Sequence, residues 1–243
     1  MSLFSPRFSG LPLGGIMKSS EKLPVAENIP ELSGNIEGLK MHSFKCVFIS
    51  ESPLSEDDRR IRAWLLHTIA TASKHYTRAR ELVELQNSND KLRGGSAIFH
   101  ILDVSEQIEN CVAAIYRACM AIRKLGSCQK AQEFCSDNKK TIEELRSIRN
   151  QFEHMHSQVT VSEIGCGPIS IVFDNEGQSI KFRKLSMDTY SLHALIDGAY
   201  RFVASLYPTF NVDSLREAGG PFKVTMTASV TIADTDRNRG QSD

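Results

Sequence analysis

The chain has 243 residues, of which 41% are hydrophobic and 24% are charged, and its 29 Lys and Arg residues balance its 29 Asp and Glu residues. This composition excludes an intrinsically disordered chain, a collagen-like or low-complexity fibre and a histone-like basic protein. A chain of this length forms one or two domains and buries a core that needs no disulfide or metal ion to stabilise it.

Several features of the sequence indicate a cytoplasmic protein. No stretch approaches the roughly 18 uninterrupted apolar residues of a membrane span, and Pro, Gly and Arg interrupt residues 1–17, so neither a membrane span nor a secretory signal is expected. The six cysteines form no CxxC or CxxxC pair. We therefore expect free thiols in a reducing cytosol, with a set of disulfides as the alternative.

The first half of the chain changes character near residue 43. Residues 1–42 are rich in Pro, Gly and Ser and predict an extended, mobile leader, and residues 44–49 are typical of one short strand. A capping box of Ser55 and Asp58 predicts a helix that begins at residue 57 and ends near residue 86. A second helix, with Ser96 as its cap, is expected to end at Gly126.

Apolar residues recur at spacings of three and four along both predicted helices, as in amphipathic helices that face a core. They are Ile61, Trp64, Leu65, Ile69, Ala72, Tyr76, Ala79, Leu82 and Val83 in the first helix, and Ile101, Val104, Ile108, Cys111, Val112, Ile115, Cys119 and Ile122 in the second.

The second half adds shorter elements. A short helix is predicted at 128–135, and a capping box of Thr141 and Glu144 predicts a helix that ends near Val159. Alternation at 169–173 and 179–183, on either side of the turn 174–177, predicts a β-hairpin. Further elements are a helix at 187–207, a strand at 222–232 and a polar tail at 234–243.

These elements predict a mainly α fold, a bundle of four to five helices with an appended β-hairpin and short strands. The expected organisation is a leader at 1–42, the helical bundle at 43–207 with the hairpin at 169–183, and a C-terminal strand and polar tail at 208–243.

Most sequence signatures of catalysis are missing. The chain has no GxGxxG, GxxxxGK[ST], GxSxG or HExxH motif and no EF-hand loop. No His, Cys, Asp and Glu residues stand at metal-ligand spacing, and His154-Met155-His156 alone supplies too few ligands. We therefore expect no cofactor and no metal ion.

One segment, residues 146–154 on the predicted helix that ends near Val159, combines Arg149, Asn150 and His154. At about 100° per residue, the apolar residues of this helix cluster in one arc, Arg149 lies about 80° to one flank, and Asn150 and His154 lie near the opposite face. The three residues should therefore lie outside the core. The clustered apolar residues are Leu145, Ile148, Phe152, Met155 and Val159.

Arg149-Asn150-x-x-x-His154 resembles the R-N-x3-H form of the R-x4-6-H motif of HEPN domains. These are all-α domains found in prokaryotic toxins, CRISPR effectors and RNA-processing enzymes. The resemblance implies a HEPN-like bundle, a composite cleft at a homodimer interface and RNA as substrate. It is compatible with a toxin or phage-defence component and with an antitoxin or other regulatory protein as a further partner.

The residue types suit metal-independent RNA cleavage. A guanidinium holds a phosphodiester and stabilises the charge that builds up on it, and an imidazole takes the proton from a ribose 2′-hydroxyl or protonates the leaving oxygen. Asn150 would orient the imidazole or the phosphate. Arg149 and His154 lie about 140° apart around the helix axis, so a two-fold axis that brings two copies together would complete the site.

A different class of function stays open. The net charge of zero gives the chain no overall basic character. The alternative is therefore a non-catalytic helical interaction or RNA-binding module that dimerises through the same helix face. A small-molecule sensor is a third hypothesis without a distinguishing residue.

Overall fold

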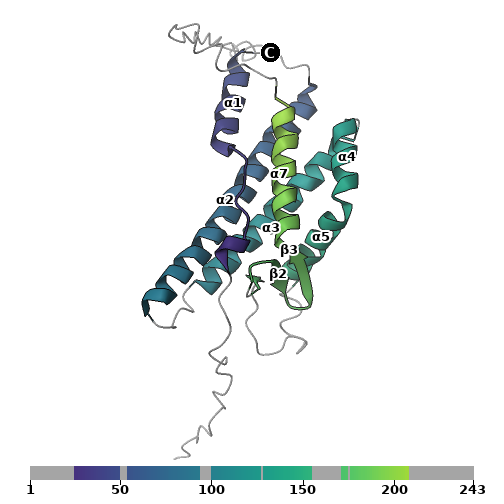
Figure 1. The fold of residues 1–243 in the computed structure, drawn as a ribbon. Coiled ribbons are helices and arrows are strands. Elements are labelled where there is room, and N and C mark those ends of the chain that lie inside the picture. The colour runs from purple at the N-terminus through teal and green to yellow at the C-terminus, as the bar shows by residue number, and fades with distance from the viewer. Residues whose placement is uncertain are drawn as a thin grey trace, which may run out of the picture.

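The computed structural model describes residues 25–49, 54–93, 100–126, 128–154, 171–174 and 176–207. Helices form most of this part of the chain, and a small antiparallel sheet lies at one end of the bundle (Figure 1). The elements are η1 (Ala26–Asn28), α1 (Ile36–Ile49), α2 (Glu56–Arg93), α3 (Ile101–Lys124), α4 (Gln129–Asp137), α5 (Lys139–Glu153), β1 (Val172–Phe173), β2 (Ser179–Phe182), β3 (Leu185–Asp188) and α7 (Thr189–Ser205). The predicted mainly α fold with a β-hairpin is confirmed.

The long helices α2 and α3 form the most extensive helix–helix contact among the described residues. The Ser55 hydroxyl caps α2 as predicted, because the Asp58 backbone N–H donates to Ser55 Oγ at 3.1 Å. The fully buried residues Ile108, Ile115 and Ile122 recur every seventh position of α3 and face the core. No described helix is long and apolar enough to cross a membrane.

The sheet confirms the predicted hairpin and adds a third strand. β1 pairs with β2 and β2 with β3, all antiparallel, with Ile180 opposite Phe173 on one side and Met187 on the other. We expected the last helix to begin at Met187. It begins at Thr189 because the Asp188 carboxylate caps it, accepting from the Ser191 N–H at 2.6 Å, and this leaves residues 185–188 to β3.

Two predictions for the N-terminal region are wrong. Residues 44–49 belong to helix α1, which also occupies the last part of the predicted leader. Asn35 begins this helix, since its side-chain Oδ1 accepts from the Gly38 N–H at 2.8 Å. Leu39 and Cys46, seven residues apart and thus on one helix face, are both buried in the core.

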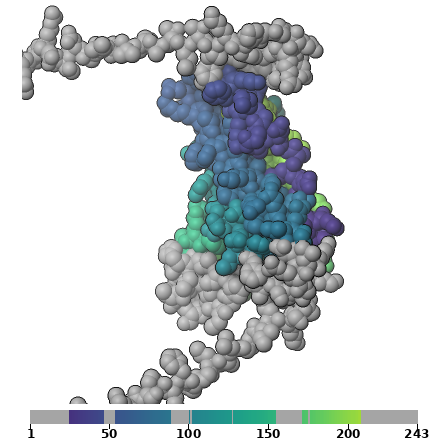
Figure 2. Space-filling model, turned by 90° about the vertical axis from the view of Figure 1, so that its left-hand side faces the viewer, coloured from purple at the N-terminus to yellow at the C-terminus, as the bar shows by residue number. Residues whose placement is uncertain are grey.

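Residues 25–35, which we name the N-terminal strap, are docked on the bundle and do not form a mobile leader. Ile29 is completely buried, and side chains donate hydrogen bonds to the backbone carbonyls of this part of the strap. Tyr76 donates its hydroxyl proton to the Pro30 carbonyl at 3.0 Å, and Arg80 Nε donates to the Ile29 carbonyl at 2.9 Å. Figure 2 shows the strap and α1, in purple, against α2, in blue. The rest of the predicted leader, residues 1–24, lies outside the described residues.

Several helices begin or end at other residues than predicted. α2 continues to Arg93, seven residues beyond the predicted end at residue 86, whereas α3 ends at Lys124, just before Gly126 as expected. The capping box of Thr141 and Glu144 is wrong, because α5 begins at Lys139 directly after Asn138, which also ends α4. α5 ends at Glu153 and not near residue 159. The predicted cap Ser96, the strand at 222–232 and the polar tail lie outside the described residues.

The five described cysteines are free thiols with very different environments. Burial raises the pKa of the Cys111 and Cys119 thiols to about 12, whereas Cys128 and Cys135 are only half-buried. Because the thiolate is the reactive form, we expect alkylation of the native protein at pH 8 to label Cys128 and Cys135 and to spare Cys111 and Cys119. Mass spectrometry of the labelled peptides measures this, with protein unfolded in guanidinium as the control. Native labelling of Cys111 at the rate of Cys128 would contradict it.

Candidate active site

Helix α5 carries the motif, and its apolar face fixes which way the motif points. Leu145 and Ile148 are buried against the bundle, and the ring of the half-buried Phe152 lies 5.4 Å from that of Phe182 in β2. This places the opposite side of the last two turns at the surface, as the helical arithmetic predicts. Met155 and Val159, the other two residues of the predicted apolar face, lie outside the described residues.

Arg149 is half-buried and lies between α5 and α3. Its guanidinium carbon is 5.2 Å from the centre of the Tyr116 ring, a cation–π contact with α3. Nη1 donates to Asn150 Oδ1 at 3.1 Å, and Nη2 forms an ion pair with the Glu153 carboxylate one turn further along the helix. The guanidinium is therefore held in one place by three neighbours.

The ion pair with Glu153 does not commit Arg149 to a purely structural role. The two side chains are 31% and 44% exposed, so water screens the pair. Exposed pairs of this kind contribute only about 0–1 kcal/mol. An incoming phosphate, which offers the same bidentate geometry as a carboxylate, competes with Glu153 at little cost.

Asn150 and His154 lie one helical turn apart at the end of α5. His154 is exposed and is the C-cap of the helix, and its backbone N–H donates to the Asn150 carbonyl at 3.0 Å. Asn150 is half-buried. The structure thus brings Arg149 and Asn150 into direct contact and leaves His154 at the surface beside them.

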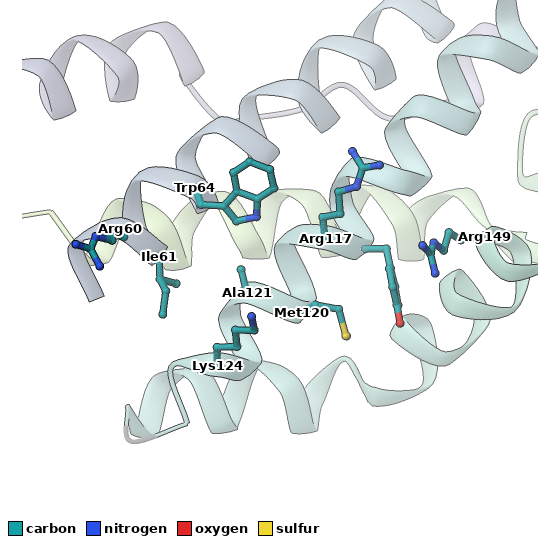
Figure 3. Close-up of a pocket in the computed structure, with 9 residues that line it drawn as sticks. Arg60, Ile61, Trp64, Arg117, Met120, Ala121, Lys124 and Arg149 are labelled. Carbon is teal, nitrogen blue, oxygen red and sulfur yellow. The ribbon is translucent and has the colours of Figure 1, made fainter. Parts of the chain in front are cut away.

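A groove that we did not predict from the sequence adjoins Arg149 (Figure 3). It has a volume of about 420 Å³, is open to solvent and lies between the first turns of α2 and the last turns of α3. Among the described residues, four cations line it, together with two aromatic and three smaller apolar side chains, and none of these lining residues is acidic. The lining residues are Arg60, Ile61, Trp64, Tyr116, Arg117, Met120, Ala121, Lys124 and Arg149.

The sequence contains a signal for each side of this groove but none for the groove itself. Arg60 and Trp64 are four residues apart and Arg117 and Lys124 are seven apart, so each pair shares a helix face, but nothing in the sequence says that the two faces meet. Trp64 was predicted to lie on the core stripe of its helix, and it is instead 50% exposed.

The described residues hold no group of three or more His, Cys, Asp and Glu side chains suited to a metal ion. Comparisons of the whole chain with protein-family models, curated proteins and solved structures found no match.

Proposed function

We propose that this protein is a HEPN-like endoribonuclease that acts as a homodimer, with Arg149, Asn150 and His154 at its site. The observation that carries the proposal is the placement of the motif. Arg149 is held at the surface by α3 and α5, next to a groove with a cationic lining, and His154 lies exposed at the end of the same helix. Buried motif residues would have been incompatible with a polymeric substrate.

The chemistry is cleavage by attack of the ribose 2′-oxygen on the adjacent phosphorus. The P–O2′ bond forms and the P–O5′ bond breaks, which leaves a 2′,3′-cyclic phosphate on one product and a 5′-hydroxyl on the other. An imidazole takes the 2′-hydroxyl proton, and a proton is delivered to the departing 5′-oxygen. The Arg149 fork stabilises the extra negative charge on the phosphoryl oxygens.

A dimer supports this chemistry better than a monomer. Helical geometry places Arg149 and His154, the C-cap of α5, about 140° apart around the helix axis, so one copy of the chain presents them in different directions. A two-fold axis beside the end of α5 would place Arg149 of one copy opposite His154 of the other. Such a dimer would contain two equivalent sites and two imidazoles.

The test is an RNA-cleavage assay on the purified full-length protein in EDTA, with labelled single-stranded and structured RNAs. We expect cleavage to 2′,3′-cyclic phosphate and 5′-hydroxyl ends, resistance of the matched oligonucleotide with a single 2′-deoxyribose at the cleaved position, and a dimeric mass by light scattering. A monomer, or the absence of cleavage across the RNA panel, would overturn the proposal.

The non-catalytic alternative has its own supporting observation. Within one protomer, Arg149 already has partners in Asn150, Glu153 and Tyr116, which is also what a purely structural arginine shows. An interaction or RNA-binding module that dimerises through this face predicts RNA or partner binding without cleavage. The same assay separates the two functions, because RNA bound and recovered intact supports the alternative.

A further inference from the structure

The groove beside Arg149 has more cationic character than the neutral chain would suggest. Arg117 and Lys124 are exposed and form no ion pair with any residue that the structure describes. Arg60 is paired with Glu56 and Asp57 on its own helix, and Arg149 with Glu153. Among the described residues, the acidic groups thus pair with Arg60 and Arg149, whereas Arg117 and Lys124 keep positive charges that suit an anion.

The aromatic side chains of the groove supply a second kind of contact. Half of the Trp64 surface is exposed, although this is the only tryptophan of the chain. Tyr116 lies under the Arg149 guanidinium, and Met120 and Ile61 add apolar surface to the lining. In Figure 3, Ile61 and Trp64 of α2 face Ala121, Met120 and Lys124 of α3, with Arg149 at the far end.

Cations combined with exposed aromatic rings favour an unpaired nucleic acid over other anions. Bases stack on aromatic side chains while Lys and Arg contact the phosphates. A duplex hides its base faces, and an acidic peptide does not carry an aromatic ring next to each negative charge, as an unpaired nucleic acid does. A volume of about 420 Å³ lies within the usual range of small-ligand pockets and offers room for about one or two nucleotides.

We propose that this groove binds the single-stranded RNA segment next to the cleaved bond, with a base on Trp64 and phosphates at Arg117 and Lys124. The strand then leaves the groove at Arg149, which belongs both to the groove and to the motif. The position of this segment relative to the cleaved bond rests on the proposed function. The binding of RNA in the groove is independent of the proposed function.

The experiment measures binding of a fluorescent single-stranded RNA to full-length His154→Ala protein by anisotropy, so that binding is observed without cleavage. Adding Trp64→Ala should weaken binding by about 5- to 100-fold, whereas Trp64→Phe should retain most of it because the ring remains. The double substitution Arg117→Ala/Lys124→Ala should lower the slope of log K against log salt by about 2. These side chains are exposed or half-exposed, and thermal unfolding of each variant checks its fold.

Matched controls remove charge and apolar surface outside the groove. Lys130→Ala/Arg201→Ala deletes two exposed cations from α4 and α7, and Leu102→Ala deletes an apolar side chain that is 73% exposed on α3. Both should bind RNA as the parent does. Equal binding by the parent, Trp64→Ala and Arg117→Ala/Lys124→Ala would overturn the inference. So would equal affinity for duplex RNA, or a mononucleotide that binds as tightly as the oligonucleotide.

Cleavage kinetics distinguish failure of this inference from failure of the proposed function. In a protein with an intact motif, Trp64→Ala should raise KM with little change in kcat, because the groove holds RNA away from the reacting atoms. If no RNA is cleaved but the groove variants still bind RNA more weakly, the proposed function is wrong and RNA binding by the groove is supported. If RNA is cleaved and the groove variants have an unchanged KM, RNA binding by the groove is contradicted and the proposed function is supported.

Discussion

His154→Ala is expected to lower RNA cleavage by about 100- to 10,000-fold, the usual contribution of a general acid or base. His154 lies exposed at the end of α5 and contributes nothing to the buried core, so the variant should fold like the wild-type protein. Single-turnover cleavage measures the chemical step, and anisotropy measures RNA binding separately. We expect the rate to fall while the RNA affinity changes little.

Arg149 should be as important for RNA cleavage as His154, because of its positive charge and because of the planar geometry of its guanidinium. Arg149→Ala removes the guanidinium, and Arg149→Lys keeps a positive charge but loses the planar fork that holds a phosphate with two bonds. We therefore expect Arg149→Lys to stay well below wild-type activity. Glu153→Gln is the matched control, since it removes only the exposed carboxylate that pairs with Arg149 and should leave cleavage intact or raise it.

Mixing the two inactive variants tests whether the site is shared between subunits. In a mixed dimer of Arg149→Ala and His154→Ala chains, a composite arrangement leaves one site with both groups intact and one with neither. After exchange of equal amounts, about one quarter of the wild-type activity should return. If Arg149 and His154 of the same chain formed the site, every site would lack one group and no activity would return. Wild-type cleavage by either single variant would refute the proposed roles outright.

The parts of this fold that sequence reasoning predicted well are those whose signal is local. The stripes of α2 and α3 repeat at helical spacing over many turns, and the hairpin is bounded by a strong turn at 174–177, so neither depends on knowledge of distant residues. Helix ends were predicted less well. Thr141 and Glu144 match a capping box, but Asn138 separates α4 from α5 and so starts the helix earlier.

The parts that were missed are those built by contacts between distant segments. The N-terminal strap has the Pro and Gly content of a linker, and it becomes structure because Ile29 fills a site formed by residues far along the chain. Ser33 illustrates this, since its hydroxyl donates to the buried Asp197 carboxylate in α7 at 2.6 Å, across 164 positions of sequence. The groove was missed for the same reason, because its lining comes from three helices. Arg149, Asn150 and His154 are close in sequence, so their shared position at the end of α5 could be predicted without knowledge of distant residues.

The strap and the hairpin turn meet at Gly177, which makes this glycine the sharpest test of how the N-terminal segment is held. Gly177 has a φ of +72°, a conformation that glycine adopts freely and other residues rarely adopt. A Cβ at this position would lie 2.6 Å from the Val25 carbonyl oxygen and 3.2 Å from Ile29 Cγ1. Next to it, Asn28 Nδ2 donates to the Glu176 carbonyl at 2.8 Å, so turn and strap fit each other closely.

Gly177→Ala is therefore expected to destabilise the protein by about 2–4 kcal/mol. The left-handed backbone accounts for about 1–2 kcal/mol, and displacement of the strap accounts for the rest. Denaturant unfolding measures the free energy of unfolding, and limited proteolysis within residues 25–35 reports whether the strap has been displaced. A change within about 0.5 kcal/mol of wild type, with unchanged proteolysis, would show that the turn does not hold the strap.

Two further variants separate the causes. Gly177→Asn tolerates the left-handed conformation but still carries a Cβ, so a loss of stability close to that of Gly177→Ala assigns the effect to the contact with Val25 and not to backbone strain. Gly126→Ala is the neutral comparison, because a Cβ there would meet only the Arg123 carbonyl at an ordinary 3.5 Å.

The hairpin lies at the N-terminal end of α7, whereas the first turns of α2, which carry Trp64, lie at its C-terminal end, where Arg62 Nη1 donates to the Leu206 carbonyl at 3.3 Å. Loss of the strap should therefore lower thermal stability before it affects the groove. RNA binding below the melting transition should stay close to wild type.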